Sequence, residues 1–152
     1  METSHKNGSY EVEKMLTIKP EENFDYVKTE LGIDIPDSST VMVMTDGNTL
    51  MGAGVMKLCD VVCTILGIYI KDEFADFSLE FGMGKSLLNT ADLRGARWAV
   101  TDISDKERLL CALRFKDTAD LKDIVPKELQ IYERFLNLEG YFDTNCSNCT
   151  KE

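Results

Sequence analysis

Histidine is almost absent from this sequence of 152 residues: His5 is the single one, and it lies in the polar N-terminal stretch Met1–Ser9. Polar chain ends tend to fray, so we expect this imidazole to be solvated. A mechanism built on a buried histidine base therefore has no candidate. The same scarcity excludes Ser-His-Asp and Cys-His catalysis and a histidine-rich metal site.

Basic residues are also few, with 17 Lys and Arg against 27 Asp and Glu, which gives a formal net charge of −10. Nucleic-acid binding needs clustered positive charge to neutralise phosphates, so this balance excludes a general DNA- or RNA-binding protein. The distribution is uneven, however: residues 82–116 carry seven basic and four acidic side chains, including four of the five arginines. We expect this stretch to face an anionic nucleotide cofactor, because arginine binds phosphate well.

Long hydrophobic runs are missing. The longest uncharged apolar run, Val61–Ile70, is too short to cross a bilayer. The N-terminus also lacks a basic region followed by an apolar segment, which is the pattern of a secretory signal. We therefore expect a cytoplasmic protein without a membrane partner.

The five cysteines are an odd number, and without a secretory signal they favour free thiols over a disulfide framework. Cys146-x-x-Cys149 would need two further ligands to bind a metal, so we interpret it as part of a tail and predict no metal site. Length and a hydrophobic content of 43% predict one domain with a real core. The expected boundaries are a flexible segment 1–14, a single domain 15–143 and a flexible tail 144–152.

Apolar patterning over the first third of the chain predicts a strand, a helix and a hairpin. The strand covers Met15–Lys19. The helix is expected to open at Pro20, because proline suits a first turn and the two glutamates that follow favour its positive end, and to stop at Gly32. Asp46-Gly47 between two apolar runs is the strongest short hairpin signal.

The middle of the chain contains one ambiguous segment, since Val61–Ile70 has helical spacing but is rich in β-branched and aromatic residues and carries Gly67. That composition favours a buried strand. Residues 71–80 are interpreted as an acidic loop or short helix. A helix is then expected from Gly82 to Gly95, followed by a strand over Arg97–Ile103.

A capping box predicts where the next helix begins, because Glu107 follows Ser104 by three residues. A further helix is expected around Leu129–Leu136. The resulting order, β-α-β-β-β-α-β-α with a short tail of elements, predicts a mixed α/β sheet with helices on both faces.

Gly82-Met83-Gly84 at a helix start is the segment most suggestive of chemistry. A helix that opens in glycines presents free backbone N–H groups and a positive dipole end, which together can bind a phosphate. The alternative is a glycine pair that only turns the chain into a helix. A nucleotide P-loop is excluded because Leu79 stands where its first glycine is required, and a dinucleotide fingerprint is excluded by Leu87.

The element order, together with residues 82–88, resembles the GNAT superfamily of acetyl-CoA-dependent N-acetyltransferases. Gly82-Met-Gly-Lys-Ser-Leu-Leu88 looks like the second half of that family's acetyl-CoA motif, Arg/Gln-x-x-Gly-x-Gly/Ala. The resemblance implies a mixed, mostly antiparallel twisted sheet with helices on both faces. It also implies acetyl transfer from acetyl-CoA, the cosubstrate, to a primary amine of a small molecule or peptide by direct attack on the thioester.

The same resemblance assigns site residues. The strand before the glycines would pair its backbone with the pantetheine arm, and the glycine segment would hold the pyrophosphate. The cofactor-binding residues so implied are Ile68, Tyr69, Ile70, Gly82, Met83, Gly84, Lys85 and Ser86. Removal of the amine proton would need a carboxylate acting through water, for which Glu73 and Asp60 are candidates beside the plainer interpretation of solvated surface acids. Cys111 is either a general acid or a core residue.

Two departures from the family pattern keep other functions open. Leu79 occupies the Arg/Gln position, and the last helix lacks the tyrosine that protonates the leaving thiolate. A non-catalytic acyl-CoA-binding or protein-interaction domain of the same fold is therefore an alternative. Another is a roadblock-like regulatory scaffold, which requires Val61–Ile70 to be helical. Variable loops build the substrate side of such a domain, so the sequence does not specify which amine accepts the acetyl group. A homodimer is compatible with the sequence.

Overall fold

The computed structural model describes residues 16–142. The predicted terminal segments 1–14 and 144–152, with His5, Cys146 and Cys149, lie outside the described residues. Among the helices of the described part, none is both long and apolar enough to cross a membrane.

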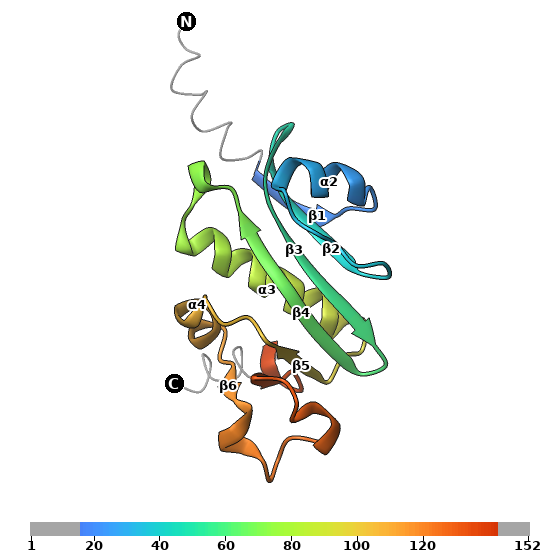
Figure 1. The fold of residues 1–152 in the computed structure, drawn as a ribbon, viewed down its shortest axis with the longest axis vertical. Coiled ribbons are helices and arrows are strands. Elements are labelled where there is room, and N and C mark those ends of the chain that lie inside the picture. Colours follow the sequence, from blue (N-terminus) through green and yellow to red (C-terminus); the bar gives the residue numbers. More distant parts are fainter. Residues whose placement is uncertain (1–15, 143–152) are drawn as a thin grey trace, which may run out of the picture.

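Residues 16–142 form a seven-stranded sheet in the order β1-β2-β3-β4-β5-β7-β6 (Figure 1). Neighbouring strands run antiparallel except for β4 and β5, which are parallel. The strands are β1 (Leu16–Pro20), β2 (Thr40–Asp46), β3 (Thr49–Cys59), β4 (Val62–Ile70), β5 (Trp98–Thr101), β6 (Lys116–Asp117) and β7 (Arg134–Asn137). The helices are α2 (Phe24–Leu31), α3 (Phe77–Leu93) and α4 (Glu107–Ala112), with 3-10 turns η1 (Asp72–Phe74), η2 (Thr118–Leu121) and η3 (Lys127–Leu129).

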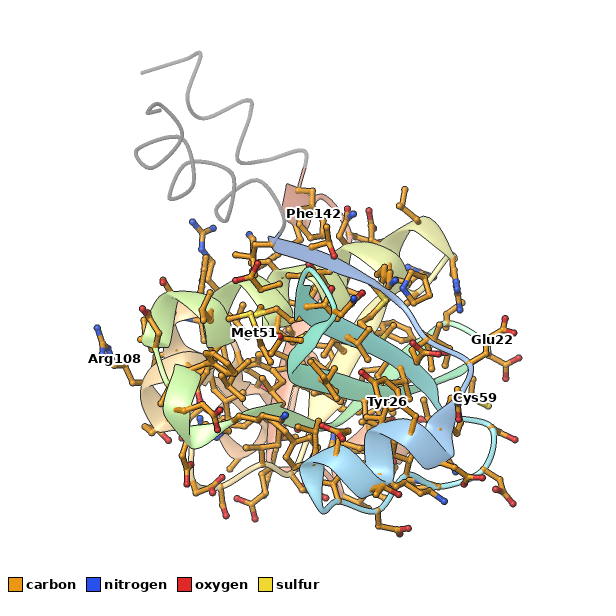
Figure 2. All side chains as sticks on the ribbon, turned by 90° about the horizontal axis from the view of Figure 1, so that it is seen from above. Glu22, Tyr26, Met51, Cys59, Arg108 and Phe142 are labelled. Carbon is orange, nitrogen blue, oxygen red and sulfur yellow. The ribbon has the colours of Figure 1, made fainter. Side chains whose placement is uncertain are left out.

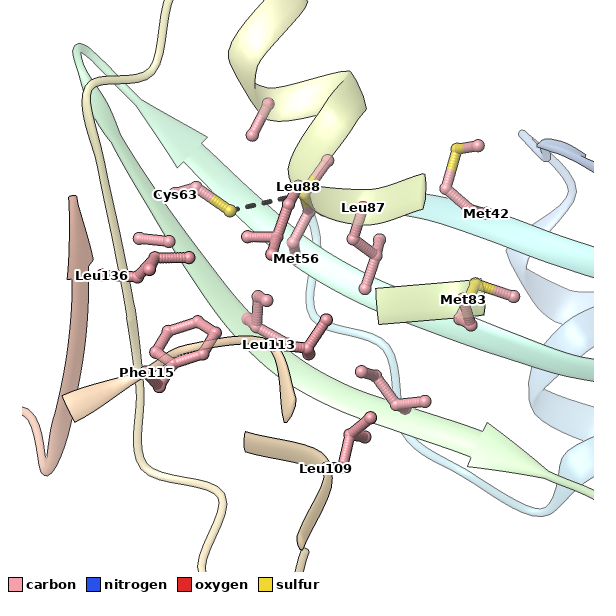
Figure 3. Close-up of a cluster of buried hydrophobic side chains, with 14 of the residues drawn as sticks. Met42, Met56, Cys63, Met83, Leu87, Leu88, Leu109, Leu113, Phe115 and Leu136 are labelled. Atoms are coloured by element: carbon pink, nitrogen blue, oxygen red, sulfur yellow. Dashed lines mark hydrogen bonds between the residues drawn. The ribbon is translucent and has the colours of Figure 1, made fainter. Parts of the chain in front are cut away.

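Helices cover both faces of the sheet, as Figure 2 shows with α2 on one side and α3 on the other. Alternate residues of a strand point to opposite faces, and β2 shows this clearly. Val41 and Val43 are buried in the same cluster as Val27 of α2. Met42 and Met44 are buried in the larger cluster that contains Leu87 of α3 (Figure 3). The predicted mixed, mostly antiparallel sheet is confirmed.

The predicted hairpin and the buried strand are confirmed as β2–β3 and β4. Gly47 has a positive φ of 62°, which is the conformation that a tight hairpin turn demands of glycine. Because Val62–Ile70 is a strand, the roadblock-like alternative is excluded.

Helix α2 begins later than predicted. Pro20 does not open it but ends β1, where it pairs with Met42 on the sheet edge and a missing N–H is tolerated. The N-cap is Asn23, whose side-chain oxygen accepts a hydrogen bond from the Tyr26 amide at 3.2 Å. Gly32 ends the helix in a left-handed conformation, as expected.

Two predictions for the C-terminal third are wrong. The Ser104–Glu107 capping box does not form, because α4 begins at Glu107 after Lys106, whose side chain makes no cap hydrogen bond. Leu129–Leu136 is not a helix: η3 ends at Leu129, and Arg134–Asn137 forms strand β7. The strand is determined by long-range pairing, since β7 lies antiparallel to β5 with Phe135 opposite Val100.

Candidate active site

Strands β4 and β5 diverge, and a cleft opens between them. Their parallel register runs from the pair Val62 and Trp98 to the pair Ile65 and Thr101 and ends there. Strand β4 continues to Ile70, so its backbone over residues 66–70 has no β5 partner (Figure 1). The space beside it measures about 950 Å³. The cleft therefore exposes a free strand edge, which is a template for hydrogen bonds to an extended ligand.

A β-bulge lies at the same level as the last β4–β5 pair. On the β3 side, Val55 pairs with Gly67 while Met56 pairs with Ile65, so Leu66 is an extra residue without a β3 partner. A bulge redirects the backbone locally and is common beside functional sites. Here it lies where β4 enters the cleft.

The predicted residues Ile68, Tyr69 and Ile70 all line this cleft. The ring of Tyr69 lies across Gly67, because a Cβ on that glycine would be only 2.2 Å from the tyrosine oxygen. Glycine at position 67 therefore leaves room for the aromatic ring to pack along the strand.

The walls of the cleft are acidic. Five carboxylates and two lysines line it: Glu30, Asp72, Glu73, Asp102, Asp105, Lys71 and Lys106. Each lysine is already paired with a carboxylate, Lys71 with Glu30 at 3.2 Å and Lys106 with Glu80 at 2.8 Å. The remaining negative charge favours a cationic ligand over an anionic one. Of the seven basic residues in 82–116, only Lys106 lines the cleft, and its charge is paired with Glu80.

Glu73, one of the two candidate bases, is exposed in η1 directly after β4 and lines the cleft. Asp60, the other candidate, lies in the turn between β3 and β4. That turn is at the opposite end of β4, so Asp60 cannot act in this cleft.

The prediction that Gly82-Met83-Gly84 opens a helix is wrong. Helix α3 begins at Phe77, and Asp76 caps it by accepting hydrogen bonds from the Ser78 amide at 2.8 Å and the Ser78 hydroxyl at 2.7 Å. These bonds hold the pKa of Asp76 below its ordinary value. Residues 82–86 lie more than a turn inside the helix, where backbone N–H groups donate to carbonyls four residues earlier. In this conformation they have no free amides for a phosphate.

The two glycines of α3 have different reasons to be there. A Cβ at Gly84 would lie 2.7 Å from Leu113, so close packing of α3 against the chain after α4 requires glycine. A Cβ at Gly82 would meet no atom within 4 Å. Packing in this structure therefore explains Gly84 and leaves Gly82 unexplained.

Lys85 and Cys111 lie outside the cleft lining. The ammonium of Lys85 sits over the rings of Tyr141 and Phe142, 4.6 and 5.0 Å from their centroids. Partial burial, with the nearby charge of Arg114, lowers the pKa of Lys85. Cys111 is exposed on α4, with its sulfur 3.6 Å from a carboxylate oxygen of Glu107, so its interpretation as a core residue is wrong.

Neither a family model nor a curated protein sequence matches the chain. Solved structures do. Mutant forms of the spermidine/spermine N-acetyltransferase SpeG from Vibrio cholerae superpose with a TM-score of 0.61 at 10% identity, covering 87% of this chain and 99% of theirs. An acetyl-CoA-bound GNAT family acetyltransferase from Elizabethkingia anophelis gives 0.53 at 17% identity, covering 80% and 94%. An IAA acetyltransferase from Bacillus cereus gives 0.59 at 13% identity, covering 67% and 77%.

The chain has the GNAT fold. Identities this low show the fold alone, and they make the chain a divergent example of it. Within this GNAT fold, sequence reasoning missed Glu30, Asp102 and Lys106 as cleft residues. Nothing in the local pattern marks them, because the tertiary arrangement of α2 and the β5–α4 connection brings them to β4.

Proposed function

We propose that the chain is an acetyl-CoA-dependent N-acetyltransferase acting on a primary amine of a small molecule or peptide. The observation that carries this proposal is the separation of β4 from β5 beside the Leu66 bulge, which leaves the backbone of residues 66–70 facing a cleft. The acetyl-CoA in the Elizabethkingia structure supports the choice of cosubstrate.

The fit to acetyl-CoA differs between its two halves. The pantetheine arm is a linear chain that contains amide groups. The free edge of β4 offers backbone hydrogen-bond donors and acceptors in an extended row, which such a chain can pair with. The diphosphate does not fit at residues 82–86, whose amides lie inside α3, and the N-terminus of that helix is capped by the Asp76 carboxylate. We therefore assign the pantetheine arm to β4 and no group of residues 82–86 to the diphosphate.

The chain's own residues would perform three tasks in transfer. The acidic walls would attract the cationic form of an amine acceptor. Glu73 would accept the ammonium proton through a water molecule, freeing the nitrogen lone pair for attack. A backbone amide of β4 at the cleft would donate a hydrogen bond to the thioester oxygen as negative charge develops on it.

A non-catalytic domain of the same fold, binding an acyl-CoA or a protein, is the second candidate. It is favoured by the helical state of residues 82–86 and by the position of Cys111 outside the cleft. With Cys111 absent from the cleft lining, a different group must protonate the leaving thiolate if transfer occurs.

Calorimetric titration with acetyl-CoA, CoA and pantetheine, followed by thiol-release assays with a panel of amines, separates the candidates. Binding with turnover supports the acetyltransferase. Binding of acetyl-CoA without release of thiol from any amine supports the second candidate. Absence of binding at millimolar acetyl-CoA overturns the proposed function.

A further inference from the structure

A buried hydroxyl stands at the point where β4 and β5 part. Thr101 is fully buried and pairs with Ile65 at the last position of the parallel register. Its Oγ1 donates a hydrogen bond to the carbonyl of Ile65 at 2.8 Å and accepts one from the amide of Ile103 at 3.2 Å. A hydroxyl has one proton and two lone pairs, so it can make both bonds at once.

The two bonds act on different parts of the backbone. The bond to Ile65 ties the end of β5 to β4. The bond from Ile103, two residues after the threonine, is the side-chain-to-backbone turn that Ser and Thr form, and it bends the chain out of the strand direction. One side chain thus ends the pairing and starts the turn.

The next residue directs the chain away from β4. The Asp102 carboxylate accepts a hydrogen bond from the Glu133 amide at 2.8 Å. Glu133 immediately precedes β7, which flanks β5 on the side opposite β4. Consecutive side chains therefore hold the end of β5 against β4 and then anchor the following chain toward β7.

We propose that Thr101 is the positioning residue that holds the cleft between β4 and β5 open for its ligand. This proposal rests on the proposed function only for the identity of that ligand. A free strand edge tends to recruit another strand. Without the Thr101 turn, residues 102–106 are free to continue along the unpaired edge of β4 and occupy the place of an extended ligand. The hydroxyl prevents this by committing the Ile103 amide to a turn.

Thr101→Val keeps the shape of the side chain and removes both hydrogen bonds, whereas Thr101→Ser keeps the hydroxyl. Val100→Ala is the matched control for stability, because Val100 is also fully buried on β5 but packs with Phe135 and Val125 and does not line the cleft. All variants are made in the full chain, and urea unfolding of each measures the stability that the substitution costs.

The test is calorimetric affinity for acetyl-CoA together with hydrogen exchange of the Ile103 amide. We expect Thr101→Val to weaken binding by about tenfold or more and to accelerate Ile103 exchange by a similar factor, since the partly buried Ile103 amide loses its acceptor. Thr101→Ser should restore both, and Val100→Ala should change affinity by less than about threefold. If Thr101→Val fails to fold, Thr101→Cys takes its place in the comparison with Thr101→Ser. Cysteine is close in shape to serine, but its thiol is a weak hydrogen-bonding group.

The inference is overturned if the variant without the hydroxyl binds like the wild type, or if Thr101→Ser loses affinity as fully as Thr101→Val. A wild-type protein that binds no acetyl-CoA overturns the proposed function instead. In that case the exchange measurement still decides: an Ile103 amide that exchanges equally fast in wild type and Thr101→Val refutes the role of Thr101, and a selective acceleration supports it.

Discussion

Gly82→Ala tests whether α3 truly runs through the glycine segment. A Cβ at position 82 meets no atom within 4 Å, so the substitution brings no steric cost. Alanine in a helix interior is more favourable than glycine by about 0.5–1 kcal/mol. The variant should therefore be stabilised by about that amount, which for a domain of this size raises Tm by about 1–4 °C. If residues 82–84 instead formed a loop that cradles phosphate, alanine would bring no such gain.

Gly84→Ala is the matched control two residues along the same helix. Its Cβ would lie 2.7 Å from a methyl of the fully buried Leu113, so overpacking of about 1–3 kcal/mol should outweigh the gain in helix propensity. Urea unfolding with linear extrapolation measures both variants. A stabilised Gly82→Ala beside a destabilised Gly84→Ala supports the helix. Destabilisation by Gly82→Ala, or equal effects of the two, would refute it.

Three further predictions follow from single side chains. Asp76→Ala should lower the free energy of unfolding at neutral pH, because hydrogen bonds from Ser78 depress the pKa of Asp76 in the folded protein. The difference between wild type and variant is fully present above the carboxyl pKa of the unfolded chain. In urea titrations it should vanish as the pH falls through the Asp76 pKa of the folded protein. Glu73→Gln should reduce turnover by about a hundredfold or more with acetyl-CoA affinity unchanged, since a general base contributes at that scale, and an equal loss in Asp60→Asn would argue against the assignment. Cys63, whose pKa burial raises to about 12, should resist alkylation at pH 8 until urea unfolds the chain, whereas exposed Cys59 and Cys111 should react; peptide mass spectrometry shows the order.

Much of the architecture was predictable because its signals are local. The hairpin follows from Asp46-Gly47, and the buried strand β4 follows from a run of β-branched residues. Together with the order of elements they predicted a mixed sheet with helices on both faces, but not strand β7 or the starts of α2 and α3. The resemblance to the GNAT superfamily pointed to Ile68–Ile70 and to Glu73, and all of these residues line the cleft.

The errors have a common physical origin, since each depends on contacts that are distant in sequence or on a choice between equivalent caps. The sequence offers two possible starts for α3, an N-cap at Asp76 and the glycines Gly82 and Gly84. The larger hydrophobic cluster, which buries Met83 and Leu87, favours the longer helix that begins after Asp76. Strand β7 has no marked β pattern and exists because β5 offers it a free edge. Thr101 carries no motif, and only the tertiary structure shows what its hydroxyl connects.

We assign the acyl donor to the free edge of β4. Amide chemical shifts of the isotopically labelled protein, followed during titration with acetyl-CoA, test this assignment directly. We expect saturable changes that are largest at the amides of residues 66–70 and at Ile103 across the cleft. The absence of saturable changes, or changes that centre on Lys85 and Tyr141 instead, would contradict binding of the acyl donor at β4.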